Sequence, residues 1–239
     1  MENVLVVAWR DYLASRKSRV AAVYLLFIFA IYSTRLVFTV SGAIQRSAHL
    51  PVSLLLVDQA VTWLSLSAAL VTYYAFGGVL ITREKHTKTL EALLASPLSP
   101  QALWVGKSAF TFAVAVGMSG LISIMSLIAL NVFRPTGTAV LLPSAPATVF
   151  LVLAGPALVG SVILLLNLAT LMSWNVVLVN LILIVAFTVP MTMSGSTRLT
   201  MVFGWQHDIA AGCATVIIGG AAMILQRYLT AERIVLTQG

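Results

Sequence analysis

Charge is scarce in this sequence. Of 239 residues only 9% are charged, whereas 60% are hydrophobic, and the mean hydropathy is +1.01. Ordinary globular chains carry about 25% charged residues, and a soluble domain of this length cannot hide so much apolar surface. The composition therefore argues against a soluble enzyme, a disordered chain and a nucleic-acid-binding protein. It favours an integral membrane protein.

Cysteine occurs only once, as Cys213, in an apolar run. A single thiol forms neither a disulfide within the chain nor a cysteine metal cluster, so we expect Cys213 to be a packing residue. A basic stretch before an early apolar run, the mark of a cleavable signal peptide, is also lacking. The chain starts Met1-Glu2-Asn3, and its first apolar stretch, 4–9, is short. We expect the N-terminus to remain uncleaved.

Long stretches without charge mark the expected membrane spans, because a helix needs about 20 apolar residues to cross the hydrocarbon core. The charge-free stretch 135–197 is too long for one helix, and Ser173-Trp174-Asn175 is its natural break. Strands of a membrane β-barrel are much shorter than these runs. We therefore expect an all-α integral membrane protein with a single transmembrane domain, 1–239. Its six spans lie at about 20–40, 59–82, 108–133, 146–172, 176–193 and 208–226.

Basic residues are distributed unevenly between the two sides that six spans create. The net charge is +7, from 14 basic and 7 acidic residues. The side with both termini and the 83–107 loop carries ten Lys and Arg, against four on the other side if Arg35 is counted there. Because cytoplasmic loops collect Lys and Arg, we expect both termini in the cytoplasm. The chain would be a multi-pass protein of the cytoplasmic (plasma) membrane.

The N-terminal segment, 1–19, mixes apolar positions such as Val4 and Val7 with charged ones such as Arg10 and Asp11. This pattern is typical of an amphipathic helix that lies on membrane lipid and leads into the first span. A frayed basic tail is the alternative interpretation.

The loop 83–107 is the longest polar segment and reads REKHTKTLEALLASPLSPQALWVGK. Residues 89–96 suit a short helix, in which Leu90, Leu93 and Leu94 recur at i, i+3 and i+4 and share one face. The prolines that follow end this helix. The leucines have nothing in water to pack on. They would therefore either dip into the membrane interface or dock into the groove of a partner.

A longer pattern runs through this loop: E-x-x-x-x-T-L-E-x-L-L-x-S-P-L-S, followed by G-K. In this sequence the first part of the pattern runs from Glu84 to Ser99, and the G-K pair is Gly106-Lys107. It resembles the cytoplasmic loop of the ABC-2 type transporter permeases. The resemblance extends to Trp9-Arg10-Asp11 and to the six-span plan, and so covers most of the chain.

The resemblance implies that the loop carries a coupling helix, which sits on a separate ATP-hydrolysing subunit. It also implies a second permease copy or a homologous permease, and short re-entrant helices at about 191–207. ATP and Mg²⁺ would then be bound by the partner ATPase, with no cofactor on this chain. The residues implied to couple to that subunit are Glu84, Lys85, Thr89, Leu90, Glu91, Leu93, Leu94, Pro97 and Leu98.

Gly106-Lys107-Ser108 ends like a phosphate-binding loop, but the full motif needs a glycine where this chain has Gln101. We therefore expect no nucleotide site and no enzymatic activity on this chain. Nothing in the spacing of His49, Asp58 and His207-Asp208 requires a metal site, and we expect none.

Polar residues within the expected spans are candidates for lining a substrate path, and they are Arg35, Asn167 and Asn180. For Arg35 the alternative is a side chain that snorkels to the outer surface. For the asparagines it is hydrogen bonding between helices. Gly77-Gly78, just before the loop, suits either a hinge or close helix packing.

Taken together, these features predict the permease subunit of an ATP-driven exporter. Its apolar, weakly charged pathway suits a hydrophobic or amphipathic substrate, such as a drug, a lipid or a peptide. An ATP-independent secondary transporter is one alternative, although such a transporter needs ionisable residues at mid-membrane to couple ions to transport. A subunit of a haem- or cytochrome-assembly exporter shares the size and span number. A membrane scaffold without transport is a further alternative.

Overall fold

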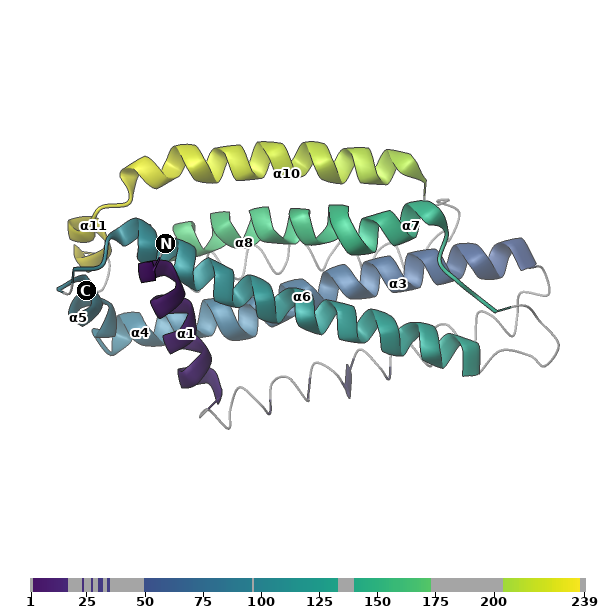
Figure 1. The fold of residues 1–239 in the computed structure, drawn as a ribbon, viewed down its shortest axis with the longest axis horizontal. Coiled ribbons are helices and arrows are strands. Elements are labelled where there is room, and N and C mark those ends of the chain that lie inside the picture. The colour runs from purple at the N-terminus through teal and green to yellow at the C-terminus, as the bar shows by residue number, and fades with distance from the viewer. Residues whose placement is uncertain are drawn as a thin grey trace.

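The computed structural model describes residues 2–16, 50–95, 97–132, 140–172 and 204–236, together with Val23, Phe27, Ala30, Ile31 and Thr34. Every regular element in this part of the chain is helical (Figure 1). The expected all-α class is confirmed for the described residues.

Four of the described helical stretches are long and apolar enough to cross a membrane, which indicates a membrane protein. They are Val61–Lys85, Pro100–Val132, Ala145–Met172 and Trp205–Tyr228. They correspond to the spans expected at 59–82, 108–133, 146–172 and 208–226. The spans expected at 20–40 and 176–193, the connection 191–207, and the candidate pathway residues Arg35 and Asn180 lie outside the described residues.

Two long helices begin the bundle and run alongside each other. Helix α3 (Leu50–Tyr73) passes through a π-helical turn, η1 (Tyr74–Gly78), into α4 (Val79–His86). A tight turn leads to the short helix α5 (Thr89–Leu94), and α6 (Pro100–Val132) then returns along α3. Pro100 suits the first helical position, because its missing N–H has no partner there in any case.

The C-terminal half adds two more long helices. Helix α7 (Ala145–Val149) continues through a second π-helical turn, η2 (Phe150–Ala154), into α8 (Gly155–Met172), which packs against α6. Helix α10 (Trp205–Leu225) packs on α8 and ends in the short helices η3 (Gln226–Tyr228) and α11 (Ala231–Leu236).

The N-terminal helix α1 (Glu2–Arg16) crosses α6 at one end of the bundle (Figure 1). A helix is therefore present within 1–19, and its expected position on membrane lipid stays a prediction. Helices α5 and α11 lie at the same end. We call this end, marked by α1, α5 and α11, the loop end.

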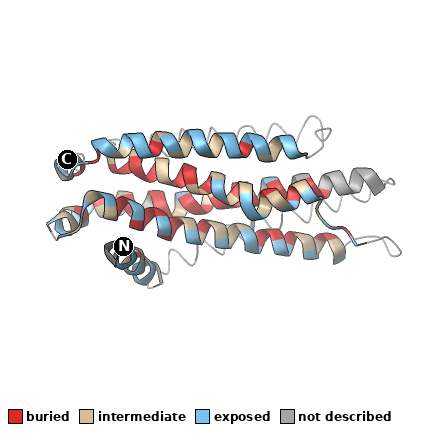
Figure 2. Cartoon of the chain, turned by 45° about the horizontal axis from the view of Figure 1, so that its top comes forward, coloured by how far each residue is buried: buried red, intermediate tan, exposed pale blue. Residues whose placement is uncertain are grey.

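The largest apolar cluster of the described residues also lies at the loop end. Its buried members are Val7, Ile81, Leu90, Leu103, Trp104, Leu168, Leu171, Ala222, Leu229 and Ile234. These residues come from α1, α4, α5, α6, α8, α10 and α11 and the short connection before α11. Figure 2 shows buried residues where the helices face one another, and mostly exposed residues along α10.

The expectation that the loop leucines lack anything to pack on is wrong. Leu90 is fully buried, and Leu93 and Leu94 pack against the same cluster. The reason is tertiary, because the ends of α6 and α8 and the C-terminal helix α11 supply the apolar surface. Burial of a leucine side chain stabilises by about 1.5–3 kcal/mol, which here fixes α5 to the body of the bundle.

Candidate functional site

The site predicted from the loop begins at the reversal between α4 and α5. The backbone N–H of Thr87 donates to the carbonyl of Arg83 (3.0 Å), which closes the end of α4. Lys88 then adopts a left-handed conformation, with φ of 56°, and α5 starts at Thr89. The reversal projects α5 beyond the end of the bundle formed by α4 and α6 (Figure 1).

The residues implied to couple to a partner subunit divide into two groups. Lys85 and Leu90 are buried, and the side chain of Glu84 is only 16% exposed, so these three serve the chain's own packing. The others are exposed or partly exposed at the loop end: Thr89, Glu91, Leu93, Leu94, Pro97 and Leu98. Only this second group offers surface to another protein.

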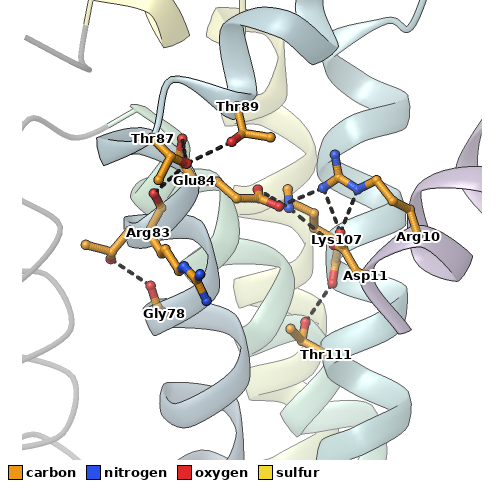
Figure 3. Close-up of polar contacts among 10 residues, drawn as sticks. Arg10, Asp11, Gly78, Arg83, Glu84, Thr87, Thr89, Lys107 and Thr111 are labelled. Atoms are coloured by element: carbon orange, nitrogen blue, oxygen red, sulfur yellow. Dashed lines mark hydrogen bonds and ion pairs between the residues drawn. The ribbon is translucent and has the colours of Figure 1, made fainter. Parts of the chain in front are cut away.

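Four charged side chains meet between α1, α4 and α6 (Figure 3). Lys107 Nζ lies 3.2 Å from Asp11 Oδ2 and 2.5 Å from Glu84 Oε2. Arg10 Nη2 lies 2.7 Å from Asp11 Oδ1 and 2.7 Å from Glu84 Oε1. We call these four residues the ion network; it joins α1, α4 and α6.

The ion network is largely removed from solvent. The Lys107 side chain is 2% exposed and that of Asp11 is 6% exposed. The two carboxylates balance the two cations, which is how a protein tolerates buried charge. Removing one partner of such a pair leaves an uncompensated charge, at a cost of about 3–5 kcal/mol. The network therefore holds the three helices in one arrangement.

Helix α1 also reaches the backbone of α6 at Gly106. A Cβ atom at this position would lie 2.7 Å from Val7 Cβ and 2.9 Å from the carbonyl oxygen of Val4. Only glycine allows so close an approach. Gly106 and Lys107 thus serve helix packing and charge pairing between α1 and α6.

A second polar group lies further along α6. The Asn167 side chain, fully buried on α8, donates to Ser108 Oγ (3.0 Å) and to Thr111 Oγ1 (3.2 Å) on α6. These are the hydrogen bonds between helices that were the alternative interpretation for Asn167. Such bonds join membrane helices because hydrocarbon offers no other partner.

A small cavity lies between α3, α6 and the η2 turn. Its lining includes Ser65, Ser119, Phe150 and Pro156, and the two serine hydroxyls share a hydrogen bond. Its volume of about 10 Å³ is room for a single water molecule. This cavity is far too small to pass a drug, a lipid or a peptide, and Asn167 does not line it.

Sequence reasoning named the four members of the ion network but did not place them together. The partners are 74 residues apart for Arg10 and Glu84 and 96 apart for Asp11 and Lys107. One signal was available: Lys107 stands alone against a long apolar stretch, and a lysine in that setting needs a carboxylate.

No protein-family model matches the chain, and neither a curated protein nor a solved structure matches it. The resemblance to ABC-2 permeases thus depends on the loop and N-terminal residues quoted above.

Proposed function

We propose that this chain is the membrane-spanning subunit of an ATP-driven ABC-2 type transporter. In this proposal it exports a hydrophobic or amphipathic substrate across the cytoplasmic membrane. It works with a second permease copy or a homologous permease. A separate ATPase subunit binds ATP and Mg²⁺ and docks at the loop end.

One observation supports this proposal most: residues that carry the resemblance lie together at the loop end. Arg10, Asp11, Glu84 and Lys107 form the ion network, while Leu90 anchors α5 in the apolar cluster. A coupling helix has to transmit displacement rather than bend. Helix α5 meets that requirement, because it is fixed on its inner face and open on its outer face.

The open face of α5 has a composition suited to a protein partner. Thr89 is exposed beside the exposed Lys88, and Glu91, the residue after the buried Leu90, is partly exposed. Closure of the ATPase subunits on ATP would favour one of two arrangements of the permease, and this face would carry the contacts that differ between them.

The test compares two charge changes in protein purified from native membranes. Glu91→Arg reverses a charge on the open face of α5, whereas Gln206→Arg adds the same cation at the exposed start of α10, at the opposite end of the bundle. We expect an ATPase subunit to co-purify with the wild type. We expect Glu91→Arg to reduce vanadate-sensitive ATP hydrolysis at least tenfold, and Gln206→Arg to leave it unchanged.

The contrary result is equally clear. If no ATP-hydrolysing subunit co-purifies with the wild type, and both variants behave like it, the ABC-2 assignment is wrong. Transport driven by ion gradients in vesicles would then be the next activity to measure.

A further inference from the structure

The helix that leads into the loop end is interrupted by the π-helical turn Tyr74–Gly78. A π turn holds one more residue than an α turn, and such turns are common at functional sites. The second described π turn, Phe150–Ala154, is followed by Pro156, whose missing N–H disturbs the helical ladder. The first turn has no proline near it, so no residue forces its geometry.

This turn is packed tightly against α6. A Cβ atom at Gly77 would lie 2.6 Å from Tyr73 Cε2 and 3.1 Å from Thr111 Cγ2. Gly77 and Gly78 are both buried. Two adjacent glycines also lower the barrier to a change of backbone conformation, because they lack the Cβ atoms that restrict φ and ψ.

Buried polar atoms without a hydrogen-bond partner among the described residues flank the same turn. They are Thr72 Oγ1 and Asn167 Oδ1, whereas the Tyr73 hydroxyl and the Thr170 side chain interact with each other. In folded proteins nearly all buried polar groups are paired, and each exception calls for an explanation. Two such atoms, one on α3 and one on α8, indicate that the contact between these helices is not fully satisfied in this arrangement.

The ion network holds the segment that follows the turn. Glu84 lies on α4, and it pairs with Lys107 at 2.5 Å and with Arg10 at 2.7 Å. Upstream of the turn, α3 packs along α6. The turn therefore separates α3, which packs along α6, from α4, which is held by the two ion pairs of Glu84 and by the buried side chain of Ile81.

We propose that the π turn and the ion pairs of Glu84 form a hinge and a latch. When the latch opens, the turn 74–78 converts to α-helix. The conversion takes the extra residue of the π turn into the regular helix. At 3.6 residues per turn and 1.5 Å per residue, this rotates α4 by about 100° and advances it by about 1.5 Å relative to α3. Helix α5 moves with α4, and the motion takes the side chains of Ile81 and Leu90 out of the apolar cluster that fixes α5 in the present arrangement. This motion belongs to the chain itself and does not depend on the proposed ATP-driven function.

The test measures a distance between nitroxide labels by pulsed electron resonance. The full chain is reconstituted in lipid nanodiscs in a Cys213→Ser background, with labels at Thr87→Cys and Gln101→Cys. Both positions are exposed; the first follows α4 and the second lies on α6. We expect Glu84→Gln to create a second distance population, displaced from the first by at least 5 Å.

Deletion of Ala75 provides the decisive comparison. The deletion removes the extra residue of the turn and leaves a continuous α-helix with α4 in its present register. Combined with Glu84→Gln, it should abolish the second population, whereas Ala75→Ser with Glu84→Gln should retain it. The proposal is overturned if Glu84→Gln shows only the wild-type distance, or if the second population survives the deletion.

Hydrogen exchange tests the same idea without a deletion, in case that variant does not fold. In Glu84→Gln, amides of 74–80 should exchange at least tenfold faster than in the wild type, while those of 158–166 on α8 keep their rate. Equal rates at 74–80, or an equal rise on α8, would contradict a local hinge.

Discussion

At the scale of single residues, the ammonium group of Lys107 is the charge that the loop end must neutralise. It is almost fully buried and has carboxylates on both sides, one from α1 and one from α4. Neither carboxylate is its neighbour in sequence. The buried ammonium group is stabilised by its pairing with these carboxylates. Single and double substitutions can measure how much that pairing contributes.

The first residue-scale prediction concerns that pairing. Asp11→Asn should lower the free energy of unfolding by about 3 kcal/mol, because it leaves Lys107 half-neutralised in a buried site. Lys107→Met should cost less, because Asp11 keeps Arg10 as a partner. The double variant should be at least about 1 kcal/mol more stable than the sum of the two losses predicts. Denaturation of the purified protein in detergent measures all three, and strict additivity would contradict the pairing.

The second residue-scale prediction concerns Lys88, whose φ of 56° lies in the left-handed region. A side chain in this region costs about 1–2 kcal/mol, and glycine avoids that strain while gaining freedom in the unfolded chain. Lys88→Gly should therefore be about 0.5–1 kcal/mol more stable than Lys88→Ala, which keeps the Cβ atom. Thermal unfolding of the two variants decides it; a less stable glycine variant would mean that the turn is not strained.

At the scale of elements, the position of each described spanning helix was predictable and its ends were not. Gaps between charges located α3, α6, α8 and α10, since hydrocarbon excludes unpaired charge. The third span was expected to start at 108, after Lys107, but α6 begins at Pro100. A paired lysine need not end a helix, and Ser99 caps this one by accepting from the N–H of Ala102.

Contacts between elements were the least predictable part. The leucine spacing placed α5 correctly, but the surface that buries Leu90 comes in part from α11, which the sequence analysis did not expect. The π turns and the approach of α1 to Gly106 also escaped prediction, because they arise from packing between distant segments and leave no periodic pattern.

The element-scale prediction tests how α1 docks on α6. Gly106→Ala should destabilise the protein by about 1–3 kcal/mol, since the new Cβ atom overlaps Val7 and the backbone of Val4. Gly117→Ala is the matched control on the same helix. Apart from its chain neighbours and the nearby backbone of α6 itself, no atom lies within 4 Å of a Cβ there, so this change should be neutral or stabilise by up to about 1 kcal/mol. Equal melting temperatures for the two variants would show that α1 does not pack closely on α6.

At the scale of the whole molecule, the two ends of the bundle and its long sides have different character. The loop end concentrates the ion network and the largest apolar cluster. Helix α10 instead exposes apolar side chains along its length, such as Ile209, Val216 and Ile217. Water solvates such a surface poorly, and membrane hydrocarbon covers it at little cost. A charge-paired, closely packed end on a body with apolar sides fits the proposed subunit, which is driven from outside the membrane.

The central claim is that α5 docks a separate ATPase subunit, and site-specific photocrosslinking in native membranes tests it most directly. A photoreactive residue is placed at Thr89, on the open face of α5, and in a matched variant at Gln206, at the opposite end of the bundle. We predict that Thr89 yields an adduct whose partner carries a phosphate-binding loop, identified by mass spectrometry, and that Gln206 does not. If Thr89 yields no such adduct, or if both positions yield the same one, helix α5 is not the docking site.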